Sequence, residues 1–421
     1  MRILLVVHAV APRYGGLSVM GPELSYELVR QGHDVSIYTT DVDGPYRLKV
    51  PVDRPVIFNG VAFNYFRGRT LPGKFVVSLP LWRALRDKVM GFDIVHSWSV
   101  YSFSMTAAAY WCRKRNIPHM VFPHGSIDPF LLRRNSPRKW VYTKLFAQRD
   151  YRRASAVLFN TAEEMRLASD WPGLRMPDGY TGNRPKLFVV PVGIDPAWLQ
   201  EPDAGAGVRL RNRFPELKGR RLIVCLGRIN FKKGLDILAR AFAQIARDRE
   251  DLHLVLAGPD SEGYGRKVRR WLADGGVLEK VTFTGPLEGE ERLAVMQEAE
   301  VFALPSYTEN FGGVVTEAMA SRVPVVISDQ VNIWPDVSKA DAGLVVPCDP
   351  DATAQALRSV LENPQRGRQM GINGRRWVAE HLPWNIVAAQ MASAYAEVVR
   401  DYRGRGSGLS EDLVGTFKTS V

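Results

Sequence analysis

Cysteine is scarce in this sequence, and no long apolar run is present. Its 421 residues include 3 cysteines, Cys112, Cys225 and Cys348, which lie far apart and form no C-x-x-C pair. Such scattered cysteines argue against a disulfide framework and a zinc site, and they are typical of a reducing compartment, so we expect a cytoplasmic protein. No apolar run approaches the ~20 residues that a membrane-spanning helix requires, so we expect no transmembrane segment.

The sequence also lacks the G-x-G-x-x-G fingerprint, which argues against a dinucleotide-dependent dehydrogenase. The opening MRILLVVHAVAP has a short apolar run that His8 interrupts, so it predicts a buried first strand rather than a secretory signal. A composition that is 46% hydrophobic and 24% charged is ordinary for a globular chain of two domains. The formal net charge of +12 indicates an anionic partner, such as a nucleotide phosphate or an acidic lipid surface, and nothing beyond this charge favours nucleic acid.

Apolar runs of strand length alternate with helical patterns along both halves of the chain. The expected strands of the first half are 2–7, 34–39, 93–98, 119–124, 156–160 and 186–191. Those of the second half are 222–227, 253–258, 281–285, 301–306, 323–328 and 343–346. In the irregular part from 41 to 72, Asn59-Gly60 predicts the turn of an antiparallel pair. The alternation predicts an α/β fold with two facing, doubly wound, mostly parallel domains and a ligand cleft at the carboxyl ends of the strands.

Composition sets the expected domain boundaries. We expect a first domain over 1–195, a linker rich in Pro, Gly and Ala over 196–219, and a second domain over 220–383. A long helix is expected over 384–402, followed by a flexible tail over 403–421.

Two carboxylates eight positions apart flank a glycine turn in the segment 306–329, SYTENFGGVVTEAMASRVPVVISD. A strand precedes the turn and a helix follows it. The sharp bend is expected at Phe311, Gly312 and Gly313. Free N–H groups and the dipole at such a helix start favour an anion, while Glu309 and Glu317 can accept hydrogen bonds from sugar hydroxyls. The alternative is an exposed helix start with a helpful acidic residue.

Two cations follow the first strand of the expected second domain, in LGRINFKKG. Arg228 lies in the loop and Lys233 near the start of the next helix. Such a pair, with helix N-termini, can stabilise a departing diphosphate where other enzymes use a metal. A basic pair in a loop can equally be a solvated surface.

The first half contributes further candidates. Gly15 and Gly16 follow the first strand, where absent side chains let the backbone approach a phosphate, unless the loop is simply flexible. His124 ends a strand before Gly125 and can donate to a sugar oxygen, although a lone histidine is more often structural. Asp128 is a candidate for contact with the acceptor.

The spacing of Glu309 and Glu317 resembles the E-x7-E motif of retaining family 4 glycosyltransferases, which belong to the glycogen-synthase-like superfamily and have the GT-B fold of two facing Rossmann-like domains. The resemblance implies that Glu309 contacts the donor sugar, that Glu317 contacts the ribose, and that Arg228 and Lys233 contact the donor diphosphate. The sequence departs from the pattern at Asn310, where glycine is commoner, at Arg322, and at Val192, where relatives often carry asparagine.

The same resemblance implies roles in the first half. Gly16 would border the donor phosphate, and His124 would contact the donor sugar near the reacting carbon. The helix over 384–402 would return to the first domain.

No metal is expected. Asp41-Val42-Asp43 and Asp349-Pro350-Asp351 have the D-x-D spacing of metal-dependent transferases, but this spacing occurs often by chance. We expect the second pair to cap a helix, and the first lies far from the expected donor domain. The donor would be a substrate, and no cofactor is expected.

The segment 101–160 is strongly basic. It holds eleven Lys and Arg residues against two Asp, and Trp111 and Trp140 lie among them. This pattern suits an anionic membrane surface or a polyanionic acceptor, and a solvated basic face is the alternative.

These features predict a retaining, metal-independent hexosyltransferase that moves a hexose from a nucleotide diphosphate sugar to a hydroxyl of a glycan or lipid-linked acceptor in polysaccharide biosynthesis. The protein would work in the cytoplasm, with peripheral contact at the inner face of the membrane. A GT-B nucleotide-sugar 2-epimerase and a non-catalytic nucleotide-sugar-binding protein are the alternatives.

Overall fold

The computed structural model describes residues 1–72, 75–133, 137–175, 184–201, 203 and 205–411. The chain divides into two compact units, which are described separately. Unit 1 contains Met1–Gly193 and Trp384–Val421, and unit 2 contains Ile194–Pro383. The chain therefore passes from one unit to the other twice.

Unit 1 is built on an 8-stranded sheet with the order β12-β11-β10-β9-β1-β2-β6-β5. Its strands are β1 (Arg2–Ala9), β2 (Asp34–Thr40), β5 (Val56–Phe58), β6 (Val61–Phe66), β9 (Ile94–Trp98), β10 (His119–Phe122), β11 (Ala156–Phe159) and β12 (Lys186–Val189). All neighbours pair in parallel except β5 and β6, which form the expected antiparallel pair. Asn59 and Gly60 both have positive φ angles, as this tight turn requires. Two small hairpins accompany the sheet, β3 (Val42–Asp43) with β4 (Tyr46–Arg47) and β7 (Arg69–Leu71) with β8 (Phe75–Val77).

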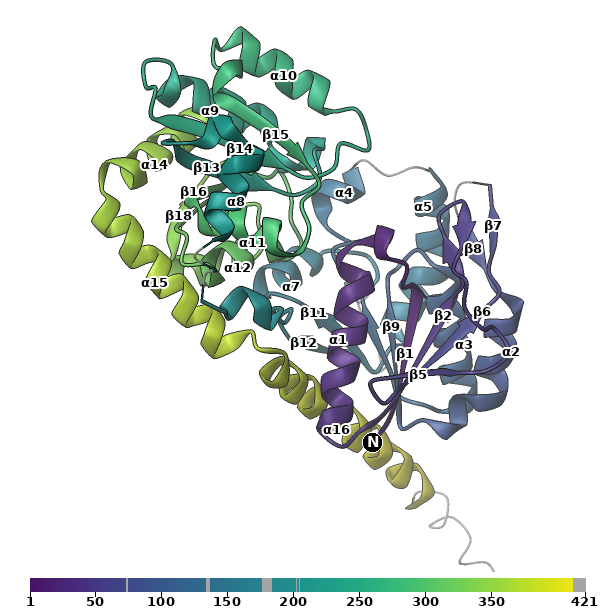
Figure 1. Ribbon diagram of the computed structural model, residues 1–421. Helices are drawn as coiled ribbons and strands as arrows, with labels where there is room; N and C mark the ends of the chain where they lie inside the picture. The colour runs from purple at the N-terminus through teal and green to yellow at the C-terminus, as the bar shows by residue number, and fades with distance from the viewer. Residues whose placement is uncertain (73–74, 134–136, 176–183, 202, 204, 412–421) are drawn as a thin grey trace, which may run out of the picture. The chain divides into compact units, whose positions relative to one another are not determined.

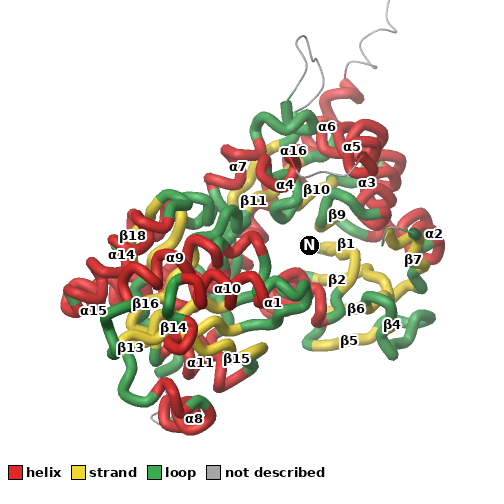
Figure 2. Tube along the Cα trace, turned by 90° about the horizontal axis from the view of Figure 1, so that it is seen from above, coloured by secondary structure: helices red, strands yellow, loops and turns green. Residues whose placement is uncertain are grey.

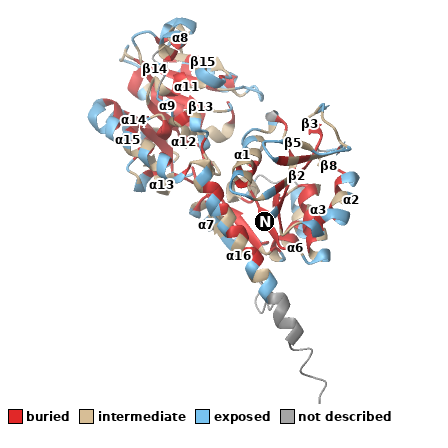
Figure 3. Cartoon of the chain, turned by 60° about the horizontal axis from the view of Figure 1, so that its bottom comes forward, coloured by how far each residue is buried: buried red, intermediate tan, exposed pale blue. Residues whose placement is uncertain are grey.

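Helices cover both faces of this sheet, which explains why its strands read as continuous apolar runs. Along β1, Ile3 and Leu5 belong to the core under α1 and α16, while Leu4 and Val6 belong to the core on the opposite face. The helices are α1 (Gly16–Arg30), α2 (Leu79–Lys88), α3 (Phe103–Arg115), α4 (Pro129–Arg133), α5 (Pro137–Tyr142), α6 (Gln148–Arg152), α7 (Ala162–Ala168) and α16 (Trp384–Glu411). Figure 1 shows α1 and α16 side by side. In Figure 3 the strands are mostly buried, whereas the outer faces of the helices are exposed.

Helix α16 belongs to the core of unit 1. Its residue Tyr395 is fully buried, and the Tyr395 hydroxyl lies 2.7 Å from Nδ1 of His96 on β9. His96, inside strand β9, is therefore a packing residue. We expected a frayed tail from Arg403, but the helix continues to Glu411, and the Arg403 guanidinium binds Asp93 at 2.8 Å. The rest of the expected tail, 412–421, lies outside the described residues.

Unit 2 is built on a 6-stranded parallel sheet with the order β15-β14-β13-β16-β17-β18. The strands are β13 (Arg221–Leu226), β14 (Leu252–Ala257), β15 (Val281–Gly285), β16 (Ala299–Leu304), β17 (Val325–Ser328) and β18 (Gly343–Val346). The helices are α8 (Ala206–Arg213), α9 (Leu235–Ala246), α10 (Gly265–Asp274), α11 (Gly289–Gln297), α12 (Gly313–Ala320), α13 (Trp334–Lys339), α14 (Pro350–Glu362) and α15 (Pro364–His381). Figure 2 shows these helices around the strands of the sheet. In chain order the strands run 3-2-1-4-5-6, the Rossmann arrangement, so the α/β fold of two Rossmann-like domains is confirmed.

The segment 196–219, expected to be a linker, is instead part of unit 2. It forms helix α8 and two short 3-10 turns, Pro196–Leu199 and Pro215–Leu217. Leu210 and Leu217 are buried, and Arg211 pairs with Glu298 at 2.7 Å. Composition suggested a linker, but this packing orders the segment. Residues 202 and 204 lie outside the described residues.

Candidate functional site

The strand order of unit 2 changes direction at two neighbouring strands, β13 and β16. From β13 the chain first adds strands on one side, through β14 and β15, and then on the other side, through β16, β17 and β18. The carboxyl ends of β13 and β16 are consequently the topological switch point of the sheet, and ligands of such folds bind there. The loop after β13 carries Arg228 and Lys233, and the loop after β16 carries Glu309.

The two loops are fastened to each other through the backbone. The N–H of Tyr307 donates to the carbonyl of Lys232 at 2.7 Å. Gly234 has a φ of 60°, and a Cβ built there would lie 1.8 Å from the carbonyl oxygen of Pro305. Only glycine fits this close approach and this conformation. The sequence therefore needs Gly234 to bring the first loop against the second.

This contact joins two predicted site residues. Nζ of Lys233 lies 2.7 Å from Oε1 of Glu309, and both side chains are largely buried. The backbone of Glu309 is held as well, since its N–H donates to the carbonyl of Gln330 at 3.0 Å and its carbonyl accepts from Asn332 at 3.0 Å. Arg228 is exposed on the first loop. This edge of the sheet thus presents a fixed carboxylate paired with the Lys233 cation.

The glycine turn has the expected form. Gly312 has a φ of 81°, and helix α12 begins at Gly313. Phe311 is buried and fixes the turn from inside. Both amide atoms of Asn310, Nδ2 and Oδ1, are buried and have no hydrogen-bond partner among the described residues. A buried amide without partners is costly, so a ligand with hydroxyl groups would satisfy it.

Glu317 lies on α12 with a partner that the sequence analysis missed. Arg292 of α11 binds both carboxylate oxygens of Glu317, at 2.7 and 2.6 Å. Burial raises the pKa of the Glu317 carboxyl to about 7, while the charges of Arg292 and Lys233 oppose that rise. The charge of Lys233, which pairs with Glu309, thus also favours the ionised form of Glu317. Arg292 carried no sequence signal, because a single arginine in a helix is usually solvent-exposed.

His124 lies in unit 1 in a strained loop after β10. It has a φ of 48°, which non-glycine residues seldom adopt, and Gly125 follows with a φ of 70°. Burial lowers the pKa of the His124 imidazole to about 4, so the ring is neutral near pH 7. Its Nδ1 is buried and has no partner among the described residues. A neutral imidazole held in this way can donate to or accept from a substrate oxygen.

A buried carboxylate that the sequence analysis missed supports this loop. Glu164 accepts hydrogen bonds from the N–H of Gly125 at 2.9 Å and from the N–H of Asn160 at 2.8 Å. Burial raises its pKa to about 7, and the two N–H groups oppose the rise. The available signal was T-x-x-E at the start of α7, where Thr161 caps the helix by accepting from the N–H of Glu164.

The glycine pair expected after β1 lies at the start of helix α1. Gly15 has a φ of 69° and precedes α1, while Gly16 is the exposed first residue of that helix. Asp128 caps α4, since its carboxylate accepts from the N–H groups of Phe130 and Leu131. The roles of Gly16, His124 and the unit 2 residues in binding or catalysis stay predictions.

The D-x-D segments have structural partners. The Asp349 carboxylate caps α14 by accepting from the N–H of Ala352 at 2.8 Å, and Asp351 accepts from Gln244. Asp41 is buried and binds Arg47 and Arg67, whereas Asp43 pairs with Arg13. In the described part of the chain, no group of three or more His, Cys, Asp or Glu side chains could hold a metal ion. Metal independence stays a prediction.

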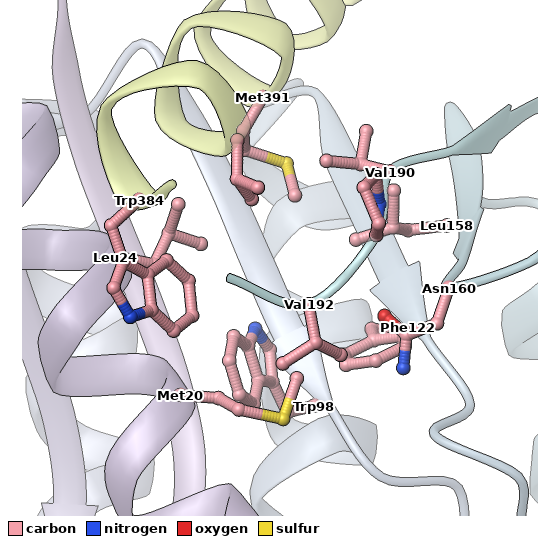
Figure 4. A pocket seen from close by; sticks show the side chains of 12 residues that line it. Met20, Leu24, Trp98, Phe122, Leu158, Asn160, Val190, Val192, Trp384 and Met391 are labelled. Carbon is pink, nitrogen blue, oxygen red and sulfur yellow. The ribbon is translucent and has the colours of Figure 1, made fainter. Parts of the chain in front are cut away.

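An apolar pocket in unit 1 is too small for a sugar. It has room of about 20 Å³, enough for one water molecule. Figure 4 shows the side chains of Trp98 and Asn160 among those that line it. Nε1 of Trp98 and Nδ2 of Asn160 have no partner among the described residues.

Within the described residues, no helix has the length and apolar character needed to cross a bilayer.

Comparison with known proteins agrees with this arrangement. The sequence profile described as Glycosyltransferase Family 4 matches residues 14–198, and the profile described as Glycosyl transferases group 1 matches residues 209–377. The GDP-mannose-dependent alpha-(1-6)-phosphatidylinositol monomannoside mannosyltransferase of Mycolicibacterium smegmatis is 32% identical over 55% of this chain. That alignment spans 62% of the relative, less than two thirds of its length.

Other relatives match along nearly the whole chain. The MMP alpha-(1->4)-mannosyltransferase of Mycolicibacterium hassiacum is 27% identical over 95% of this chain and 98% of its own. The solved structure of sucrose-phosphate synthase from Thermosynechococcus elongatus superposes with a TM-score of 0.73 at 22% identity, over 95% of this chain and 100% of that one. Its likeness shows the fold. The chain is a glycosyltransferase of family 4 with the GT-B fold.

Proposed function

We propose that this protein moves a hexose from a nucleotide diphosphate sugar to a hydroxyl of a lipid-linked or glycan acceptor, with retention of anomeric configuration and without a required metal. The observation that carries the proposal is the ion pair of Lys233 and Glu309 at the carboxyl ends of β13 and β16. Such a pair holds both groups in place before the donor arrives, which lowers the cost of binding.

The charges match the parts of a donor. Arg228 and Lys233 are suited to the diphosphate, where negative charge grows as the sugar leaves. The Glu309 carboxylate and the unpartnered Asn310 amide are suited to the sugar hydroxyls, because the amide both donates and accepts. Arg292 orients Glu317 for the ribose.

The acceptor class draws on the relatives. One relative is named for GDP-mannose and a phosphatidylinositol mannoside, and this supports a nucleotide-activated hexose and a lipid-linked acceptor. Neutral His124 would donate to an oxygen of the donor sugar, and the leaving phosphate would assist attack from the same face. A role in polysaccharide biosynthesis and a cytoplasmic location belong to the same proposal.

The test is incubation with a panel of nucleotide sugars that includes GDP-mannose and UDP-glucose, each with and without a lipid-linked acceptor. We expect release of the nucleoside diphosphate to rise when the acceptor is present, in buffer containing EDTA, with a product of retained configuration by NMR. A changed sugar without an acceptor would indicate the 2-epimerase. Binding without turnover across the panel would indicate the non-catalytic protein.

A further inference from the structure

The helical segment 137–152 of unit 1 exposes large apolar side chains at close spacing. It consists of α5, a π-helical turn (Thr143–Ala147) and α6. Trp140 is 62% exposed, Val141 45%, Leu145 60% and Phe146 37%. We call these four residues the apolar face. Four large apolar side chains within seven residues form a concentrated patch of the kind that marks an interaction site.

The opposite side of the segment is firmly packed, so the exposure does not come from a loosely held helix. The Tyr142 hydroxyl donates to the carbonyl of Ser102 at 2.8 Å and lies 2.5 Å from Oγ1 of Thr106. Ala147 and Tyr151 are fully buried in the neighbouring core. The fold therefore presents the apolar face on a fixed support.

Exposed cations lie in and directly after the same helical segment. Lys139, Lys144, Arg149 and Arg153 are exposed. The acid of this segment, Asp150, is buried and pairs with Arg113 at 2.7 Å and with Arg149 at 3.6 Å, so it offsets part of the Arg149 charge. Nζ of Lys144 lies 6.0 Å from the ring centroid of Trp140. Arg134, part of the basic stretch noted in the sequence, lies outside the described residues.

We propose that the apolar face docks on an anionic lipid surface. Trp and Leu side chains enter the headgroup and acyl boundary while neighbouring cations contact lipid phosphates. An exposed tryptophan with Lys144 beside it, in a segment with further exposed cations, is complementary to such a surface. The inference deepens the proposed function, because it brings the transferase to a lipid-linked acceptor.

The experiment is flotation of the full chain with vesicles of phosphatidylcholine, alone or mixed with phosphatidylglycerol, at low and high salt. We expect flotation with the anionic vesicles and its loss at high salt, because salt screens the cations. The double variant Trp140→Ser and Leu145→Ser should lose at least about tenfold in vesicle partitioning, since both removed side chains are apolar. Lys144→Glu, at an exposed position, should weaken anionic binding alone.

The matched control is the double variant Val208→Ser and Ile372→Ser in unit 2, whose side chains are 62% and 51% exposed. It should float like the unmodified protein. Equal flotation of the Trp140 and Leu145 variant and the control would overturn the proposal, as would equal binding to neutral vesicles. Loss of a concentration-dependent dimer in that variant, without any vesicle binding by the parent, would assign the face to a second copy instead.

Turnover separates the two proposals. With a water-soluble acceptor analogue, all three variants should keep the activity of the parent, since none touches the donor site. If the parent floats but no nucleotide sugar is turned over, the proposed function fails and the lipid surface stands.

Discussion

Removing the charge of Lys233 tests the donor site directly. In Lys233→Met the side chain keeps its approximate length, while Glu309 loses its partner at 2.7 Å. At an effective dielectric constant of about 20, that attraction is about 6 kcal/mol before desolvation is subtracted. More important for activity, a donor aimed at developing charge typically contributes about 10²–10³ to kcat, or roughly 3–4 kcal/mol. We expect kcat/KM for the donor to fall by a factor in that range.

The assay combines turnover with calorimetric titration of the nucleoside diphosphate. Lys233→Met should bind the diphosphate more weakly, both because a cation is lost and because the unpaired Glu309 carboxylate now repels the phosphates. Adding Glu309→Gln to Lys233→Met should therefore restore part of the diphosphate affinity, although sugar recognition stays impaired. The control is Lys339→Met, which removes an exposed lysine of the same unit. It should leave both measurements unchanged.

Two results would refute the reasoning. One is a Lys233→Met protein that is folded by circular dichroism and turns over within threefold of the parent. The other is a double variant that binds the diphosphate no better than Lys233→Met, because the proposed repulsion from Glu309 would then be absent.

Further predictions concern pH, a glycine and a buried carboxylate. Since the pKa of Glu317 is raised to about 7, lowering the pH below 7 protonates it, and donor affinity should fall by up to about tenfold per pH unit. Glu317→Gln should flatten that profile, and an unchanged slope would count against the assignment. Gly234→Ala should lower the free energy of unfolding in urea by more than about 1 kcal/mol, because its Cβ would meet the Pro305 carbonyl at 1.8 Å. Glu164→Gln should cost about 1–3 kcal/mol in the same assay, because the two N–H groups bind different carboxylate oxygens and the amide NH2 group that replaces one oxygen cannot accept. Because Glu164 supports the His124 loop, this variant should also lower the rate of sugar transfer without changing diphosphate affinity. Equal losses of transfer rate and diphosphate affinity would indicate a general folding defect.

Much of the fold could be predicted because its strands are buried on both faces. The runs at 222–227 and 301–306 correspond to β13 and β16 within two residues at each end. Local conformation could be predicted too, since Asn59-Gly60 and Gly312 occur where positive φ angles are needed. The expected linker failed because composition reports local flexibility, and helix α8 is ordered by contacts with α11.

The sequence by itself determined the alternation of strands and helices, the glycine turns, and the candidate residues at the ends of strands. Only the tertiary structure decided which of those residues meet. Lys233 reaches Glu309 because the strand order makes β13 and β16 neighbours, and Glu317 is held by Arg292 from another helix. Likewise, the carboxylate of Glu164, in helix α7 after β11, accepts from the N–H of Gly125 in the loop after β10. Such pairs join residues far apart in the chain, and no local periodicity encodes them, because they arise from packing.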